Sequence, residues 1–407
     1  MTERDEVRKH GIVVNRMPQA AETGSMKTAI YVMLGLFVLA LGWLTPKVGP
    51  VLLDGYAIQP AVVTTEGDTG YLILVSPAES PELAINGISG EKVAFLPRSD
   101  MNQLDPNERY LFTSHEGVSS SGVTRIELAT GRTDIIVGQD DVSHSRADGL
   151  LWTPWGTLLL GEERTGGRVF EILNPLAEPD AIQLVELAGL GRLRHEGLAI
   201  DARGFLYGVD EVSGGGIFRF RPDKPLTAES LRSGQLDSLV VDGDVGKLED
   251  GRLAARWEPI AAADPASFAR PEDLEIVGDT LYVALTGTHE VISIDLADPD
   301  ATSVGLLVSA ATNLPGLNNP DNLASDADGN LYIAEDIAPS RFSRPRNQLW
   351  FARVGRPLEP AVETSLVATL NRPHNEFSGI LVDASGERLY TNVLGTDNYI
   401  LAILIGE

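Results

Sequence analysis

Short apolar runs alternate with polar residues along most of the chain, and one plan recurs. Each copy has an acidic residue, a short apolar run, a turn containing Gly or Asp, a second apolar run and a polar end. The clear copies cover 147–163, 195–211, 270–287, 319–336 and 374–393, and a weaker sixth covers 104–116. Alternating runs around such a turn predict antiparallel hairpins, with both ends of each hairpin on one side of a sheet.

The spacing of the copies predicts how the hairpins are organised. Three of the four intervals between opening acids are 48, 49 and 55 residues long, a length that suits a four-stranded propeller blade. The remaining interval, from Glu196 to Glu272, is 76 residues long and indicates an insertion at about 221–267. No further copy of the plan occurs within that interval, so we count six blades.

We therefore predict an all-β fold, a six-bladed β-propeller over residues 45–407. Apolar runs at 71–75 and 399–405 lie outside the copies, and pairing them in one blade would close the ring and cover its edges. An open β-sandwich is the alternative architecture.

The N-terminal region differs from the rest of the chain. Residues 28–44 form an uncharged, largely apolar run of seventeen residues, the lower limit for a membrane-spanning helix. The tail at 1–27 is rich in Lys and Arg, which predicts that it stays cytoplasmic. We expect one N-terminal transmembrane helix that anchors an exported domain on the periplasmic or extracellular side; a cleaved signal peptide is the alternative.

Composition excludes several kinds of chemistry. The 58 acidic residues outnumber the 32 basic ones, and the formal net charge of −26 disfavours nucleic-acid partners. The chain has no cysteine, which excludes disulfides, thiolate metal sites and cysteine nucleophiles.

Acidic residues at the hairpin ends are expected to meet at the mouth of the propeller channel. Carboxylates at such density repel one another unless they are protonated or bound to hard cations, which favours Ca²⁺ or a similar ion. The predicted metal ligands are Asp148, Glu163, Glu196, Glu272, Asp321, Glu335 and Glu376. By contrast, Asp326 and Asp328 are interpreted as ordinary turn residues beside Gly329.

Arg270 precedes Pro271 and Glu272 at a blade opening, so its guanidinium is expected beside the carboxylates. There it would hold an oxyanion, or alternatively form a salt bridge with Glu272 or Asp273. Other catalytic patterns are absent from the sequence: no G-x-S-x-G, H-E-x-x-H or Walker motif occurs.

Three segments, 148–163, 167–172 and 270–273, resemble the PhoX-type alkaline phosphatases, and the resemblance extends over about 105–393. It implies a six-bladed propeller that hydrolyses phosphate esters with a cluster of Ca²⁺ and Fe³⁺ ions. Glu163, Glu196 and Glu272 would match metal-binding glutamates of the family, and Arg270 its phosphate-binding arginine. Asp148 stands where the family has a cysteine ligand for iron, so calcium is the firmer expectation and Fe³⁺ the weaker one.

Together these observations predict a membrane-anchored, metal-dependent phosphoesterase that hydrolyses a small-molecule phosphate monoester, with Arg270 as its catalytic residue. Two alternatives remain on the same scaffold. One is a Ca²⁺-dependent lactonase or esterase of the gluconolactonase type, in which one ion polarises a carbonyl. The other is a non-catalytic binding propeller that calcium stabilises.

Overall fold

A computed structural model describes residues 61–62, 71–73, 82–85, 88–92, 98–117, 121–138, 146–263, 265–336, 347–370, 376–394 and 399–405. All of these belong to the second of two compact units, Val48–Glu407. The predicted tail at 1–27 and the apolar run at 28–44 lie outside the described residues. Among the residues that are described, no helix is both long and apolar enough to cross a membrane.

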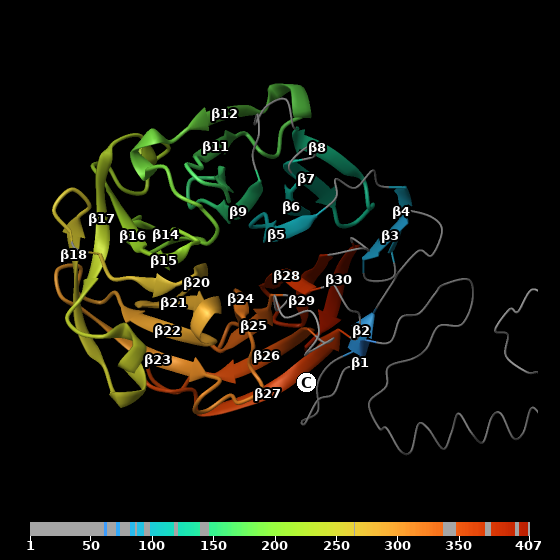
Figure 1. The fold of residues 1–407 in the computed structure, drawn as a ribbon. Coiled ribbons are helices and arrows are strands. Elements are labelled where there is room, and N and C mark those ends of the chain that lie inside the picture. Colours follow the sequence, from blue (N-terminus) through green and yellow to red (C-terminus); the bar gives the residue numbers. More distant parts are fainter. Residues whose placement is uncertain are drawn as a thin grey trace, which may run out of the picture. The chain divides into compact units, whose positions relative to one another are not determined.

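Twenty-four of the 30 described strands form six antiparallel groups of four, which follow one another along the chain and are called blades 1 to 6 (Figure 1). Blade 1 contains β5 (Ser99–Leu104), β6 (Tyr110–Glu116), β7 (Ser121–Glu127) and β8 (Thr133–Val137). Blade 2 contains β9 (Ala147–Trp152), β10 (Leu158–Glu162), β11 (Val169–Leu173) and β12 (Gln183–Glu186). Blade 3 contains β13 (Leu198–Ile200), β14 (Leu206–Val209), β16 (Ile217–Pro222) and β17 (Gly234–Val241).

The second half of the unit repeats this arrangement. Blade 4 contains β20 (Pro271–Val277), β21 (Thr280–Leu285), β22 (Glu290–Asp295) and β23 (Thr302–Ser309). Blade 5 contains β24 (Pro320–Ser325), β25 (Leu331–Glu335), β26 (Asn347–Arg353) and β27 (Glu363–Leu370), and β1 (Ala61–Val62) pairs with its outer strand. Blade 6 contains β28 (Glu376–Val382), β29 (Arg388–Leu394), β30 (Tyr399–Leu404) and β2 (Tyr71–Ile73).

The first strands of the six blades contact one another in a closed cycle, in the order β5, β9, β13, β20, β24, β28 and back to β5. Figure 1 shows labelled members of this set facing a common centre, with the outer strands of the blades around them. The fold is therefore all-β and propeller-like. Each predicted hairpin is the pair formed by the first and second strands of one blade.

The expected closure of the ring is confirmed. β2 pairs with β30 in antiparallel register, with Tyr71 opposite Leu404, so a strand from the start of the unit completes the last blade. This pairing covers the edge that β30 would otherwise present to other chains.

The segment at 221–267 forms the outer edge of two blades. β17 is the outer strand of blade 3, and β18 (Leu253–Pro259) pairs with both β17 and β23, which joins blades 3 and 4 into one nine-stranded sheet. Phe268 and Ala269 then form β19, which pairs with β15 (Ser213–Gly215). The additional strand therefore lies at the outer edges of the blades.

Buried apolar side chains fill the spaces between neighbouring blades. Met101 and Phe112 of blade 1 pack in one cluster with Leu150 and Leu158 of blade 2, and comparable clusters join the blades that follow. Burial of this surface is the main favourable contribution to folding. It also fixes the positions of the inner strands, which carry the polar residues described below.

Candidate metal centre

The inner strands begin with a repeated backbone arrangement. In four blades an arginine lies two positions before the opening acid, and in blade 5 Asn319 takes this place. The carbonyl of this residue accepts a hydrogen bond from the N–H of the residue that follows the second strand or ends it, at 2.8–3.1 Å. The pairs are Arg98 with Glu116, Arg146 with Glu163, Arg194 with Glu211, Arg270 with Thr286, and Asn319 with Asp336.

This bond joins both ends of the hairpin in blades 1 to 5, so the first and last residues of those hairpins lie together, as the sequence pattern predicts. Arg98, Arg270 and Asn319 have positive φ angles of 66°, 60° and 48°, a strained conformation for residues other than glycine. Such strain persists where the surrounding structure enforces it, and it is common at functional sites.

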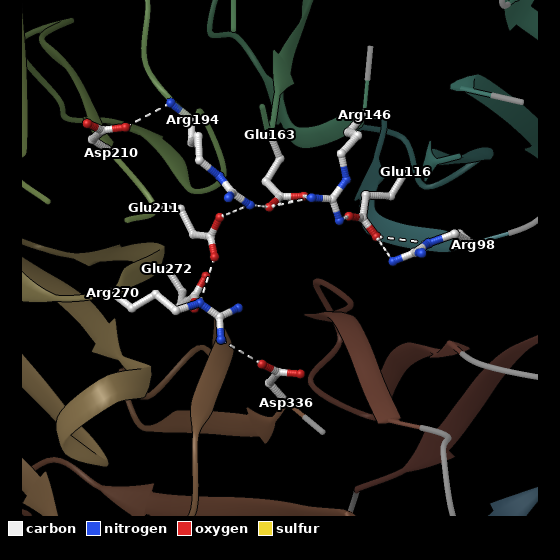
Figure 2. Close-up of polar contacts among 10 residues, drawn as sticks. All are labelled: Arg98, Glu116, Arg146, Glu163, Arg194, Asp210, Glu211, Arg270, Glu272 and Asp336. Atoms are coloured by element: carbon white, nitrogen blue, oxygen red, sulfur yellow. Dashed lines mark hydrogen bonds and ion pairs between the residues drawn. The ribbon is translucent and has the colours of Figure 1, made fainter. Parts of the chain in front are cut away.

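Arginine and carboxylate side chains alternate from blade to blade in an arc (Figure 2). The arginine–carboxylate arc consists of Arg98, Glu116, Arg146, Glu163, Arg194, Glu211, Arg270 and Asp336. Each interior carboxylate contacts two guanidinium groups, and each interior arginine contacts acids of at least two blades. Four positive charges thereby balance four negative ones.

Arg270 is the most heavily paired member of the arc. Its Nε lies 2.6 Å from Glu211 Oε1 and 2.8 Å from Glu272 Oε1, and its Nη1 lies 3.0 Å from Asp336 Oδ2. Burial opposes the charged form, but these three carboxylates outweigh it and raise the pKa of Arg270. The predicted salt bridge to Glu272 is thus present. The hydrogen bonds and ion pairs that Arg270 forms with described residues use Nε and Nη1, and Figure 2 draws none at Nη2.

Five further acids are more buried than the arginines of the arc and form fewer contacts with basic side chains. This acid cluster consists of Asp100, Asp148, Glu196, Glu272 and Asp321, whose exposed fractions are 0–9%, whereas the arginine side chains of the arc are 26–51% exposed. All but Glu196 occupy the second position of an inner strand, and Glu196 comes shortly before β13. The sheet therefore turns the same side-chain position of each blade toward one centre.

Two triads of carboxylates are close enough to share a cation. Glu163, Glu196 and Glu211 form the first triad, and Glu196, Glu272 and Asp321 form the second; within each, one oxygen from every residue lies within 4.8 Å of the others. Glu196 belongs to both triads. The two candidate sites therefore adjoin each other.

Burial and mutual repulsion dominate the electrostatics of the acid cluster. Burial first, and then the neighbouring carboxylates, raise the pKa values of Asp148, Glu196 and Asp321 well above the usual range. Burial raises the pKa of Glu272 to about 7, and the nearby Glu211 charge acts in the same direction. These carboxyl groups must bind either protons or cations, because ionised carboxylates at this density are unstable without either.

The donor atoms fit a hard cation. Asp148 Oδ1 and both carboxylate oxygens of Glu272 are buried and accept no hydrogen bond that meets geometric criteria, although Glu272 has the close approach of Arg270 described above. Every donor in the two triads is a carboxylate oxygen, the ligand type that Ca²⁺ prefers. Buried, unbonded oxygens of this type are those that an ion would satisfy.

The structure brings Asp148, Glu163, Glu196, Glu272 and Asp321 to one centre. Glu376 is buried at the start of β28 but belongs to neither triad found among the described residues.

Glu335 has a structural role. Its carboxylate accepts hydrogen bonds from the backbone N–H groups of Asn318 and Gln348 and from Trp350 Nε1. Glu335 belongs to neither triad found among the described residues, and Asp336, one residue later, occupies the position that corresponds to Glu163 and Glu211. Successive residues of a strand point to opposite faces, so a shift of one residue changes the role completely.

Sequence reasoning missed several members of the centre. Asp100 lies before the weak sixth copy as we delimited it, and Glu211 was noted as a hairpin end but was not among the predicted ligands. The arginines at 98, 146 and 194 were also missed. A repeated sequence pattern could have identified these arginines and Asp100, because Arg-x-Asp or Arg-x-Glu recurs at 98–100, 146–148, 194–196 and 270–272.

Comparisons with known proteins support the fold. Searches with family models and against curated protein sequences gave no match. Among solved structures, Pseudomonas fluorescens PhoX in complex with vanadate, a transition-state analogue, has a TM-score of 0.62 at 16% identity and covers 86% of this chain and 98% of its own.

Two other similar structures have lower scores. The calcium-binding protein regucalcin from Agrobacterium tumefaciens has a TM-score of 0.48 at 12% identity, with 76% of this chain and 90% of that one covered. A gluconolactonase from Xanthomonas campestris has a TM-score of 0.45 at 16% identity, with 85% and 97% covered. At these identities the likeness concerns the fold alone, which is all-β and propeller-like.

Proposed function

We propose that this chain is a metal-dependent phosphoesterase that hydrolyses small phosphate monoesters at the acid cluster. One observation carries the proposal: a buried group of hard oxygen donors with unbonded atoms lies directly beside a fixed arginine. Its support is the similarity of the fold to a PhoX structure whose bound vanadate is a transition-state analogue. With a formal net charge of −26, the chain is expected to have no nucleic-acid partner.

Glu196, Glu272 and Asp321 would hold the ion, with Asp148 nearby. When bound, a divalent ion supplies positive charge that polarises a phosphoryl oxygen and lowers the pKa of water. Calcium suits these ligands, and Fe³⁺ is a second candidate because carboxylates also bind it.

Arg270 would bind the substrate. Glu211 and Asp336 hold its guanidinium from two sides, so little rotational freedom is lost when Nη2 donates to a phosphoryl oxygen. A preorganised donor of this kind stabilises the charge that develops on the equatorial oxygens in the transition state. Arg270 is therefore assigned the catalytic role.

The test is hydrolysis of p-nitrophenyl phosphate by the full-length chain, with and without Ca²⁺ and Fe³⁺. We expect Arg270→Ala to lower kcat/KM by about 100-fold, the typical loss of one charge-stabilising donor. Glu272→Gln should abolish the increase in activity that added metal produces, because it removes one ligand of the ion. Arg353→Ala is the matched control, because this arginine forms an exposed ion pair with Glu363 on outer strands. Unchanged activity in both centre variants would refute the assignment.

A Ca²⁺-dependent lactonase or esterase is the second candidate. The observation in its favour is that arginine contacts engage two carboxylates of the first triad, so a single ion in the second triad would face the substrate. One ion suffices to polarise a neutral carbonyl. Assays on an aldonolactone separate the two activities, since loss of Arg270 should matter much less for an uncharged substrate. A protein inert on both substrates, but stabilised by calcium, would be a binding propeller.

We also propose that residues 28–44 anchor the chain in a membrane with the acidic unit exported. The support is the uncharged run of seventeen residues after a basic tail. Protease accessibility in spheroplasts and intact cells tests this. Cleavage of the acidic unit in spheroplasts with a sealed inner membrane is expected, and complete protection there would contradict the proposal.

A further inference from the structure

We infer that Arg194 takes the place of a metal ion in the first triad, so that the centre holds one cation, bound by Glu196, Glu272 and Asp321. The inference deepens the proposed function and rests on it for the identity of the reaction. Its basis is the position of one guanidinium group among carboxylates that would otherwise form a second cation site.

Arg194 lies within the first triad. Its Nη2 contacts Glu163 Oε1 and Glu211 Oε2, which are two of the three carboxylates in that triad (Figure 2). Glu163 and Glu211 are 5% and 3% exposed, so water competes little with these contacts. One nitrogen bound by two acids from adjacent blades does what a bridging cation does.

Two neighbouring arginines also contact carboxylates of the first triad. Arg146 Nη1 lies 2.9 Å from Glu163 Oε2, and Arg270 Nε lies 2.6 Å from Glu211 Oε1. A divalent ion in the first triad would therefore face three guanidinium groups at short range. Like charges in a buried site repel strongly, because the medium screens them poorly.

The second triad is different. Among the described residues, Arg270 approaches it only at Glu272, and no arginine contact is found for Glu196 or Asp321. Both oxygens of Glu272, and Oδ1 of nearby Asp148, are buried without a hydrogen bond; Glu211 Oε2 of the first triad also accepts none, but it forms an ion pair with Arg194. The negative charge that remains for a cation is thus concentrated on this side of the centre.

The backbone holds Arg194 in place. Its N–H donates to Asp210 Oδ1 at 2.9 Å, and its carbonyl accepts from the Glu211 N–H at 3.1 Å. The guanidinium is thus a fixed positive group between the two carboxylates. The consequence is a single-ion centre, which excludes a mechanism in which two ions clamp the attacking and leaving oxygens.

The test is the calcium content of the full-length chain, measured by equilibrium dialysis with Ca²⁺ alone. We expect about one ion per chain in the wild type and about two in Arg194→Gln, because the neutral amide removes the one guanidinium that contacts two carboxylates of the first triad, whereas Arg146 and Arg270 each contact only one of them. Arg98→Gln is the matched control: this arginine belongs to the same arc but contacts Glu116, which is in neither triad, so the value should stay at about one.

Two or more ions in the wild type, or no additional ion in Arg194→Gln, would overturn the inference. If Arg194→Gln fails to fold, the calcium affinities of two other variants test the inference instead. Asp321→Asn should weaken calcium binding by about 100-fold and Glu163→Gln by less than about threefold. An equal loss in both would also overturn it.

Hydrolysis of p-nitrophenyl phosphate in the same samples separates this inference from the proposed function. One ion per chain without activity on the phosphate ester would contradict the function and leave the single-ion centre intact. Activity on the phosphate ester with two or more ions per chain in the wild type would support the function and contradict the single-ion centre.

Discussion

Replacing Glu272 with glutamine should stabilise the metal-free protein and abolish its response to calcium. The side chain is fully buried on β20, and burial raises its pKa to about 7 from an ordinary value near 4.5. A raised pKa means that the folded state prefers the protonated form. The stabilising contribution is fully present below pH about 4.5 and is lost as the pH rises through about 7.

The size of the effect follows from this pKa. Each tenfold change in proton affinity corresponds to about 1.4 kcal/mol, so ionised Glu272 costs about 3 kcal/mol of unfolding free energy at pH about 8.5. Glutamine has the shape of the protonated acid and cannot ionise. We expect Glu272→Gln to be about 3 kcal/mol more stable than the wild type at that pH, and within about 1 kcal/mol of it at pH about 5.

Urea unfolding in the presence of a chelator, at both pH values, measures the difference. Glu275→Gln is the matched control, because Glu275 lies on the same strand, burial raises its pKa to about 7, and Ser325 Oγ donates to it outside the centre. Both variants should gain stability at high pH. Added calcium should then stabilise the wild type and Glu275→Gln, but not Glu272→Gln.

Two results would refute this reasoning. One is a Glu272→Gln protein that is no more stable than the wild type at high pH without metal. The other is equal stabilisation of both variants by calcium, which would place the ion elsewhere.

Three further predictions concern the centre and its frame. Chelation should lower the melting temperature more at pH about 8 than at pH about 5, because protons compete with the ion for the carboxylates; equal shifts at both pH values would argue against a carboxylate site. Gly149→Ala should weaken calcium binding, measured by calorimetry, because its Cβ would lie 1.9 Å from the Glu196 carbonyl oxygen; an unchanged affinity would show that the strands adjust. Arg219→Ala should cost about 3–5 kcal/mol of unfolding free energy, since it leaves Asp237 buried and without that partner. Arg353→Ala, which breaks an exposed ion pair, should cost less than about 1 kcal/mol of unfolding free energy. Similar losses for Arg219→Ala and Arg353→Ala in urea titrations would contradict the distinction between buried and exposed pairs.

The hairpins could be predicted because their determinants are local. Alternating apolar residues and turns such as 201–204 or 326–329 specify a hairpin whatever surrounds it, and the recurrence of one plan indicated repeated blades. The closing pair, β2 with β30, was predictable because both apolar runs lie outside the repeated copies. In contrast, nothing local in 221–267 indicated that β18 would join two blades at their outer edges.

The acids of the centre were predicted unevenly for a physical reason. Opening acids such as Asp148 and Asp321 occupy equivalent positions of equivalent strands, so one periodic pattern places them all. Glu335 and Asp336 are adjacent acids on one strand end, and only the pairing register decides which one turns to the centre.

By itself, the amino-acid sequence determined that hairpins of one design recur and that each brings acidic residues to the same end. Only the tertiary structure decided which of those acids are neutralised. Arg194 reaches Glu163 of the preceding blade, and Arg270 reaches Asp336 of the following one. Such pairing depends on distances between strands far apart in the chain, and apolar packing between blades sets those distances. That packing leaves Glu196, Glu272 and Asp321 as the carboxylates whose charge a cation would balance.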